Sequence, residues 1–227
     1  MVKGPSAAIT VLVKLDTTMQ SSIFKILLTG LVYCLSSTTT FANSSKILIL
    51  GDSLSAAYNI SIEQSWPVLF QHKLKSIDPQ NKVINASISG ETTAGGEERL
   101  GALLDQHKPS HMILELGGND GLRGFKFKQT QQSLKNIIDM AQQQNIEVLM
   151  IGVRLPPNMG PVYNQRFQQI FEQLASQFKI VYLPQFLQGI AAAKAEYMQQ
   201  DGIHPTAVAQ PLLADKVFNV FKSNYLQ

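Results

Sequence analysis

The chain contains very little cysteine and few charged residues. Cys34 is the only cysteine among its 227 residues, and it lies in an N-terminal segment that we expect to be removed. The remaining chain would then contain no thiol, which excludes disulfide bonds, thiolate zinc sites and a cysteine nucleophile. Charged residues make up only 15% of the sequence and hydrophobic residues 44%. A chain of this length and composition is too apolar to be disordered and can bury one core.

Sequence motifs for cofactors and metals are also missing. There is no GxxxxGK[ST] sequence, and no GxGxxG sequence lies between a predicted strand and a predicted helix. His72, His107 and His111 show no metal-ligand spacing with a carboxylate, so we expect them to be surface or capping residues. The sequence therefore predicts no cofactor and no metal site.

The first 42 residues have the pattern of a secretory signal. Starting from Met19, Lys25 supplies a positive charge, Ile26–Leu35 is an apolar stretch of ten residues, and Thr40–Ala42 resembles a small-x-small cleavage site. This stretch is shorter than the ~20 apolar residues that a membrane span needs. We predict that residues 1–42 are removed and that the protein is periplasmic or secreted, without a stable membrane anchor.

Three alternatives stay open for this segment. Residues 1–18 add a second apolar stretch and Asp16 before the signal pattern, so Met19 is a better start than Met1. The apolar stretch could instead remain as an N-terminal membrane anchor. Cys34 lies in the outline of a lipoprotein cleavage site, although the bulky Tyr33 precedes it where a small residue is expected.

The positive charge of the chain is concentrated in the same segment. The formal net charge is +3, but residues 1–42 carry three lysines and one aspartate. The remaining chain has 16 basic and 15 acidic side chains. Because this balance is nearly neutral, it gives no support for a nucleic-acid partner. We expect a monomer that acts on a small molecule.

Short apolar runs alternate with helical periodicity along residues 43–227. The predicted strands are Lys46–Leu50, Val83–Ala86, His111–Leu116, Glu147–Ile151 and Ile180–Leu183. The predicted helices are Gln64–Ser76, Thr92–His107, Thr130–Gln144, Tyr163–Phe178 and Ala207–Phe221. Unbroken apolar strands joined by helices are typical of a parallel sheet covered on both faces. We predict a single α/β domain, a three-layer α/β/α sandwich around a flavodoxin-like, doubly wound parallel sheet of five strands.

Polar residues and glycine follow the first three predicted strands. Ser53 comes shortly after the first strand, Gly90 after the second and Asn119 after the third. The carboxyl ends of the strands form the ligand-binding edge of such a sheet. A serine there is either a turn residue or a nucleophile, and an asparagine is either a cap or a donor to an oxyanion. Gly90 either makes a turn or lets its backbone N–H approach a ligand.

Asp201 and His204 stand three residues apart, just before the last predicted helix. This spacing lets the carboxylate reach the imidazole and leave its other nitrogen free as a base. Alone, such a pair is common and often structural. Because a doubly wound sheet brings these loops together, the combination of nucleophile, donors and Asp–His pair favours a serine hydrolase.

Four sequence blocks carry a resemblance to a known family. Ile49–Ala56, Asn85–Thr92, Glu115–Gly124 and Gln200–Pro205 resemble the blocks of the SGNH (GDSL) hydrolases, which centre on Ser, Gly, Asn and His. Within that family the blocks look like those of secreted bacterial thioesterases, lysophospholipases and arylesterases. The resemblance runs from about residue 46 to residue 215 and shows no departure at the four central positions.

The resemblance implies the SGNH hydrolase fold and a role for each of these residues. Ser53 would be the nucleophile, His204 the general base and Asp201 the carboxylate that orients it. The N–H groups of Ser53 and Gly90 and the side chain of Asn119 would form the oxyanion hole. The reaction would be hydrolysis of acyl esters and thioesters, including acyl-CoA-type thioesters, aryl esters and lysophospholipids, through an acyl-enzyme.

Two loops, Gly121–Phe127 and Leu155–Val162, are expected to form the walls of the substrate site. The predicted substrate-binding residues are Asp52, Leu122, Phe125, Leu155 and Pro156. Their largely apolar character favours an acyl chain over a sugar. A carbohydrate O-deacetylase on the same fold and a non-catalytic lipid-binding module are the alternatives. The aromatic residues near Asn119 argue against the first, and the intact Ser, Asp and His argue against the second.

Overall fold

The computed structural model describes Met1 and residues 44–226, except residues 185 and 191. Ser44–Gln227 forms a compact unit of its own. The predicted signal, its apolar stretch and Cys34 lie outside the described residues, so the expectations for that segment stay predictions.

The centre of the fold is a parallel sheet of five strands in the order β2-β1-β3-β4-β5. The strands are β1 (Lys46–Gly51), β2 (Lys82–Asn85), β3 (His111–Glu115), β4 (Glu147–Ile151) and β5 (Val181–Leu183). This is the strand order of flavodoxin-like doubly wound sheets. The predicted fold class is therefore confirmed.

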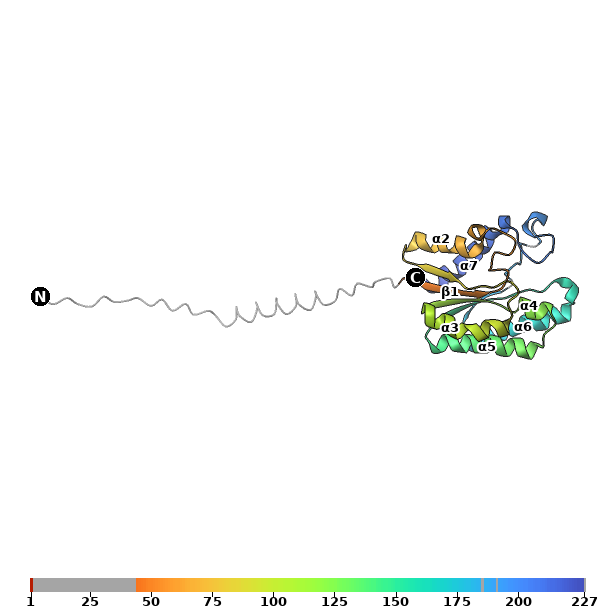
Figure 1. Cartoon of the computed structure of the whole chain (residues 1–227), viewed down its shortest axis with the longest axis horizontal. Coiled ribbons are helices and arrows are strands. Elements are labelled where there is room, and N and C mark those ends of the chain that lie inside the picture. The colour runs from red at the N-terminus through yellow and green to blue at the C-terminus, as the bar shows by residue number, and fades with distance from the viewer. Residues whose placement is uncertain (2–43, 185, 191, 227) are drawn as a thin grey trace, which may run out of the picture. The chain divides into compact units, whose positions relative to one another are not determined.

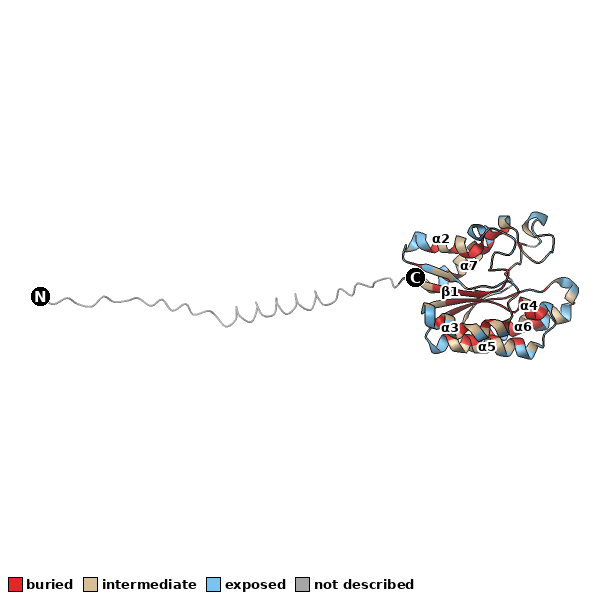
Figure 2. Cartoon of the chain, in the orientation of Figure 1, coloured by how far each residue is buried: buried red, intermediate tan, exposed pale blue. Residues whose placement is uncertain are grey.

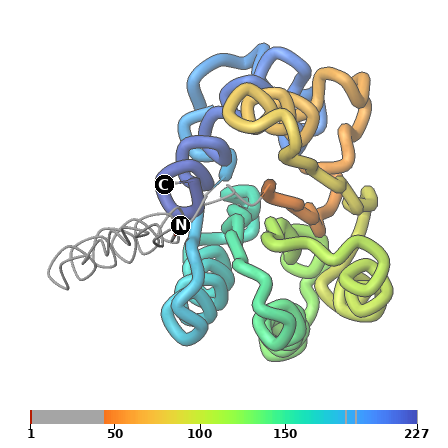
Figure 3. Tube along the Cα trace, turned by 90° about the vertical axis from the view of Figure 1, so that its left-hand side faces the viewer, coloured from red at the N-terminus to blue at the C-terminus, as the bar shows by residue number. Residues whose placement is uncertain are grey.

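Helices cover both faces of the sheet, as Figures 1 and 3 show. The helices described are α2 (Trp66–Ile77), α3 (Thr93–His107), α4 (Gly118–Leu122), α5 (Phe127–Gln143), α6 (Pro161–Phe178) and α7 (Gln210–Tyr225). Helices α2 and α7 pack together on one face, while α3, α5 and α6 form the layer on the other. Within the described part of the chain, no helix has the length and apolar character needed to cross a membrane.

The alternation of side chains along the strands produces two hydrophobic cores. In β1, Leu48 and Leu50 belong to the core beneath α3, α5 and α6, whereas Ile47 and Ile49 belong to the core beneath α2 and α7. All four side chains are fully buried, and Figure 2 shows the buried inner surfaces of both helical layers. Burial on both faces explains why the strands read as unbroken apolar runs.

The chain reverses its direction of winding between β1 and β3. Strand β1 pairs with β2 on one side and with β3 on the other, and the chain then continues outward to β4 and β5. Ligands in such sheets bind outside the carboxyl ends of the strands at this switch point. The turn after β1 and the segment after β3 are therefore placed side by side at the binding edge.

The structure differs from the predicted elements mainly after β3. Helix α4 was not predicted, because the glycine-rich segment around Gly121 is typical of a loop. It is held by distant contacts: the Asp120 carboxylate accepts hydrogen bonds from the backbone N–H and hydroxyl of Thr93, at 3.0 and 2.6 Å, and the Tyr163 hydroxyl donates to Gly121 O at 2.9 Å. Helix α5 begins at Phe127, earlier than expected.

Candidate active site

Ser53, His204 and Asp201 form a continuous chain of hydrogen bonds. His204 Nε2 lies 2.8 Å from Ser53 Oγ, and His204 Nδ1 lies 2.7 Å from Asp201 Oδ2. Ser53 stands in the turn directly after β1, while the other two residues come from the loop before α7. A base must lie within hydrogen-bond reach of the proton it removes. The structure brings together the three residues that the sequence predicted as a catalytic set.

The loop around Asp201 fixes this carboxylate tightly. Asp201 Oδ1 accepts hydrogen bonds from the backbone N–H of Ile203 at 2.9 Å and of His204 at 3.0 Å. Gly202, which follows Asp201, has a φ of +67°, a backbone conformation that residues other than glycine rarely adopt. One carboxylate oxygen therefore shapes the loop, and the other orients the imidazole.

The pKa of Asp201 is lowered to about 2. Partial burial acts to raise the pKa, but it is outweighed by hydrogen bonds from the backbone and ring of His204 and from the Ile203 N–H. All of these donors favour the charged carboxylate. Asp201 is therefore ionised at neutral pH, which is the state needed to hold one imidazole nitrogen as a donor.

The ring of Tyr58 packs against the imidazole of His204, a contact that was not predicted from the sequence. The ring centroid of Tyr58 lies 4.2 Å from that of His204, with a tilt of 33°. Gln199 Nε2 donates to Tyr58 O at 3.0 Å and to Pro205 O at 3.1 Å, which ties the two loops together. Nothing in the spacing along the chain indicates this contact, because 146 positions separate the two rings.

Asn119 and Gly90 lie at the ends of the neighbouring strands. Asn119 Nδ2 donates to Glu91 O at 2.9 Å and to Asp52 Oδ2 at 3.2 Å, so both of its amide hydrogens point to acceptors in this structure. Gly90 has a φ of +81°, and its carbonyl accepts from Arg123 Nη2 at 3.1 Å. An oxyanion would have to compete with Asp52 or Glu91 for an Asn119 N–H.

Two further carboxyl groups lie beside Ser53 in the fold, and both are buried. Asp52 is 2% exposed, and its Oδ1 accepts from Leu54 N at 3.0 Å. Glu115 at the end of β3 is completely buried, and its Oε2 accepts from Ser55 Oγ at 2.8 Å and Asp52 N at 3.3 Å. Among the described residues, Glu115 Oε1 has no hydrogen-bond partner. These contacts fix the turn that presents Ser53.

Burial changes the protonation of this pair. Desolvation is the main cause that raises the pKa of Asp52 to about 6, against the hydrogen bond from Leu54 and the charge of His204, which lower it. Desolvation followed by the charge of Asp52 raises the pKa of Glu115 well above its usual range. Because two adjacent buried carboxyls cannot easily both be charged, complete burial favours the protonated form of Glu115.

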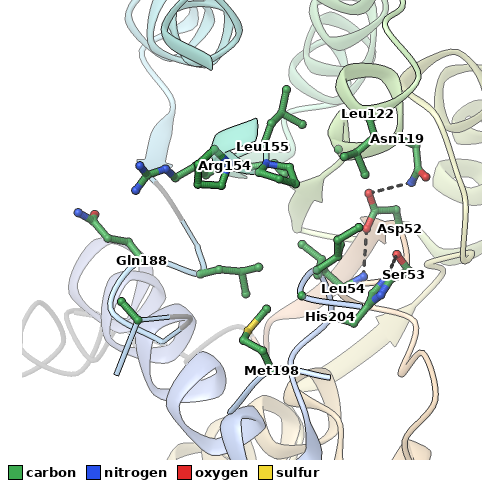
Figure 4. A pocket seen from close by; sticks show the side chains of 18 of the residues that line it. Asp52, Ser53, Leu54, Asn119, Leu122, Arg154, Leu155, Gln188, Met198 and His204 are labelled. Atoms are coloured by element: carbon green, nitrogen blue, oxygen red, sulfur yellow. Dashed lines mark hydrogen bonds between the residues drawn. The ribbon is translucent and has the colours of Figure 1, made fainter. Parts of the chain in front are cut away.

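A cavity of about 810 Å³ opens beside Ser53 and His204. Figure 4 shows their hydrogen bond at one end and apolar side chains around the space. Of the predicted substrate-binding residues, Asp52, Leu122, Leu155 and Pro156 line this cavity. Asp52 forms part of its wall, but its oxygens are already used by Leu54 and Asn119.

Phe125 does not line this cavity, so its role as a substrate contact stays a prediction that the cavity does not support. It lines a separate cavity of about 290 Å³, together with Asp120 and Thr93. The chain turns at Gly124, which has a φ of +70°, and Phe125 N donates to Asp120 O at 2.9 Å. This turn places Phe125 beside the smaller cavity.

The long connection between β5 and α7 forms a further wall of the cavity, which was not predicted from the sequence. Leu187, Gln188, Met198 and Ile203 line the cavity from this side. The apolar residues in an otherwise irregular segment were the only available signal. The described residues contain no group of three or more His, Cys, Asp or Glu side chains that could hold a metal ion.

The sequence profile of the GDSL-like Lipase/Acylhydrolase family matches residues 49–210, which include all the residues of the hydrogen-bonded chain and all three predicted oxyanion donors. The chain belongs to this family. The family resemblance of the four sequence blocks is confirmed, and so is the prediction that the protein is a hydrolase. The SGNH order of Ser, Gly, Asn and His runs along the chain as the family blocks require.

This GDSL hydrolase is similar to several named proteins. It is 47% identical to the thioesterase 1/protease 1/lysophospholipase L1 of Escherichia coli (strain K12) over 174 residues, or 77% of this chain and 82% of the relative. It is 42% identical to the esterase TesA of Pseudomonas aeruginosa over 184 residues, or 81% of this chain and 91% of the relative.

A solved esterase structure is also similar to this chain. The psychrotrophic esterase EstA from Pseudoalteromonas sp., in a structure inhibited by monoethylphosphonate, matches with a TM-score of 0.77 and 40% identity. The match covers 81% of this chain and 100% of the esterase. The GDSL hydrolase therefore shares its fold with an esterase that a phosphonate inhibits.

Proposed function

We propose that this GDSL hydrolase is an exported serine esterase and thioesterase that cleaves acyl esters and thioesters through an acyl-enzyme on Ser53. One observation carries the proposal: the hydrogen-bonded chain from Asp201 through His204 to Ser53 opens into a largely apolar cavity. Relatives named as thioesterase, lysophospholipase and arylesterase support the reaction class.

The geometry supports a two-step reaction. His204 Nε2 takes the proton of Ser53 Oγ as the oxygen attacks the acyl carbon, because a serine hydroxyl is too weak a nucleophile alone. The tetrahedral intermediate collapses when the imidazolium gives that proton to the leaving oxygen or sulfur, which departs as an alcohol or thiol. Water, deprotonated by the same nitrogen, then attacks the ester on Ser53 and releases the carboxylic acid and the free hydroxyl.

The oxyanion would be bound by the backbone N–H groups of Ser53 and Gly90 and by the Asn119 side chain. These groups follow three adjacent strands, and Asn119 is already oriented by two hydrogen bonds. Removing one such donor typically lowers kcat by ~10²–10³. Asn119→Ala is expected to show that loss in kcat with little change in KM, measured by steady-state hydrolysis of an aryl ester. A loss confined to KM would remove Asn119 from the oxyanion hole.

The cavity favours an acyl chain as the substrate group that it binds. Leu54, Leu122, Leu155 and Met198 contribute apolar walls, and the volume of about 810 Å³ far exceeds what an acetyl group needs. Ligand cavities of this kind bind mainly through apolar contact, with a few polar groups that fix orientation. Medium and long acyl esters, thioesters and lysophospholipids fit this description, whereas the acetyl group of an O-deacetylase substrate would leave most of the cavity unfilled.

The proposal includes the location of the protein. The signal-like pattern of residues 1–42 supports export to the periplasm or the medium and a mature chain that begins near residue 43. The mature enzyme would be a monomer without a stable membrane anchor. N-terminal sequencing of the protein recovered from the periplasm or medium tests this. A mature chain that retains Ile26–Leu35 would contradict it.

The function is tested by hydrolysis of a series of p-nitrophenyl esters from acetate to palmitate, with matching acyl-CoA thioesters and lysophospholipids. We expect kcat/KM to rise with chain length beyond acetate. Ser53→Ala should lower kcat by ~10³ or more for every substrate, because residual activity then rests on binding and the oxyanion hole.

Ser133→Ala is a matched control, since Ser133 lies on α5 beside the smaller cavity. It should keep the activity of the wild type. Preference for acetate over octanoate would indicate the O-deacetylase instead. Undiminished hydrolysis by Ser53→Ala would contradict the proposed mechanism.

A further inference from the structure

Each of the five connections that leave the carboxyl ends of the strands exposes a large apolar side chain. These residues are Ile62 after β1, Ile88 after β2, Leu122 after β3, Val162 after β4 and Val208 after β5, and they are 36% to 67% exposed. We call this set the apolar rim. Because the strands are all parallel, the five residues lie at the same edge of the sheet as Ser53.

The opposite edge of the sheet differs. Among the described residues from 44 onward, Ile77 at the end of α2 is the one large apolar side chain exposed there. Single exposed apolar residues are common on protein surfaces, but their collection at one edge is typical of an interaction surface. One member of the apolar rim also lines the cavity, because Leu122 is both exposed and part of the cavity wall.

The charges at this edge indicate what covers it. Arg123, Lys126, Lys128 and Arg154 are exposed on the connections after β3 and β4, and within the described chain none of them forms an ion pair. We call these four residues the basic group.

Acidic groups at the same edge do not cancel the basic group. Glu196 pairs with Lys194, and Asp201 is occupied by His204. Glu91 pairs with Arg99, which leaves Glu63 as an exposed acid outside these pairs. Apolar side chains beside positive charges match a surface that offers acyl chains beneath anionic headgroups.

We propose that the apolar rim and the basic group dock this hydrolase on the surface of an anionic phospholipid aggregate. The mouth of the catalytic cavity would then face the lipid, and an amphiphilic substrate could pass its acyl chain into the cavity without crossing water. The proposal rests on the proposed function only in choosing lipid as the partner. Docking itself does not need the nucleophile.

Vesicle flotation tests the docking directly. The chain is used from residue 43 onward with Ser53→Ala, because the described core lies after residue 43 and the substitution prevents lipid hydrolysis. Vesicles contain phosphatidylcholine alone or phosphatidylcholine with phosphatidylglycerol. We expect the protein to float with the mixed vesicles and to bind the neutral vesicles more weakly.

Matched variants separate the two edges. Ile62→Ser combined with Val162→Ser and Val208→Ser should lower the partition coefficient by about ten-fold or more, since three branched side chains no longer enter the lipid. Ile77→Ser should change it by less than about two-fold, because Ile77 lies at the far edge. Wild type and variants should hydrolyse a soluble short-chain ester at equal rates when Ser53 is present, which shows that they are folded.

The charge contribution has its own control. Lys126→Gln with Lys128→Gln should remove the preference for mixed vesicles, whereas Lys75→Gln with Lys82→Gln at the opposite edge should retain it. No flotation of the parent chain, or equal losses from Ile62→Ser and Ile77→Ser, would overturn the proposal. A dimer in sedimentation equilibrium that the rim substitutions dissociate would assign the surface to a second copy instead.

Failure of docking and failure of the proposed function give different results. If Ser53→Ala keeps full hydrolysis, the catalytic assignment is wrong whatever the vesicles show. If the parent chain does not float but Ser53→Ala abolishes ester hydrolysis, the catalytic assignment stands and the docking surface is wrong.

Discussion

Two sets of carboxyl groups flank Ser53, and they behave in opposite ways. Asp201 lies in an exposed loop where three hydrogen bonds favour its charge and lower its pKa to about 2. Asp52 and Glu115 are buried beside Ser53, where desolvation raises both pKa values. The charge of Asp201 is therefore stabilised in its loop, whereas Asp52 and Glu115 serve as buried hydrogen-bond acceptors.

Removing the charge of Asp201 should have the largest effect in this comparison. Asp201→Asn keeps a side-chain oxygen for the loop N–H groups but can no longer hold His204 in the required tautomer. In serine hydrolases this type of change costs up to ~10⁴ in kcat, and we expect a loss of ~10²–10⁴ here. Steady-state kinetics measures it. Asp215→Asn, which affects an ion pair with Lys73 on the surface, is the control and should retain activity.

Ionisation of Asp52 should lower the free energy of unfolding, whereas ionisation of Asp201 should raise it. The pKa of Asp52 rises from 3.8 to about 6 in the folded protein, so the folded state binds a proton more tightly than the unfolded state. The resulting stability is complete below about pH 3.8 and is lost as pH rises through 6. This rise in the pKa of Asp52 corresponds to a pH-dependent stability of roughly 3 kcal/mol at most.

Asp52→Asn should therefore gain stability relative to the wild type between pH 4 and pH 7, as urea unfolding at each pH can show. Asp201→Asn should lose its deficit only as pH falls below about 4, because the pKa of Asp201 is lowered. Its change should be smaller, since solvent screens this exposed group. Parallel pH curves for the two variants would break the comparison.

Substitution of Glu115 by glutamine should have the smallest effect, and it tests whether this buried carboxyl is neutral. If its carboxyl is neutral, Glu115→Gln replaces one uncharged acceptor by another and should change the free energy of unfolding by less than about 1 kcal/mol. Glu115→Ala leaves the Asp52 N–H and the Ser55 hydroxyl without their acceptor, which should cost about 2–4 kcal/mol. Equal destabilisation by Gln and Ala would show that the charge of Glu115 is needed. Urea unfolding at pH 7 measures both.

The sheet and the meeting of Ser53 with the Asp201–His204 loop could be predicted from the sequence for a physical reason. Parallel strands end at one edge, so residues that follow β1 and β3 converge wherever the strands are recognised. The apolar runs that mark these strands are buried on both faces and give an unbroken signal, as in Ile47–Leu50. Asp201 and His204 are local in the chain, so their spacing alone carries their contact.

The missed features depend on contacts between distant parts of the chain. Tyr58 reaches His204 through loop packing, and α4 depends on Asp120 binding Thr93. Phe125 was expected beside the substrate but lines the smaller cavity, and an apolar residue near Asn119 does not reveal the turn at Gly124. The role of Glu115 follows only from its complete burial beside Asp52.

The central claim is that Ser53 is the nucleophile of this hydrolase, and covalent labelling tests it most directly. A structural relative was solved with monoethylphosphonate as its inhibitor, so an activated phosphonate ester is a suitable probe. Peptide mass spectrometry should find one phosphonate adduct on Ser53, formed in step with the loss of ester hydrolysis. Asp201→Asn should form it far more slowly, and Ser53→Ala should not form it. An adduct on another serine, or full inhibition without modification of Ser53, would contradict the account.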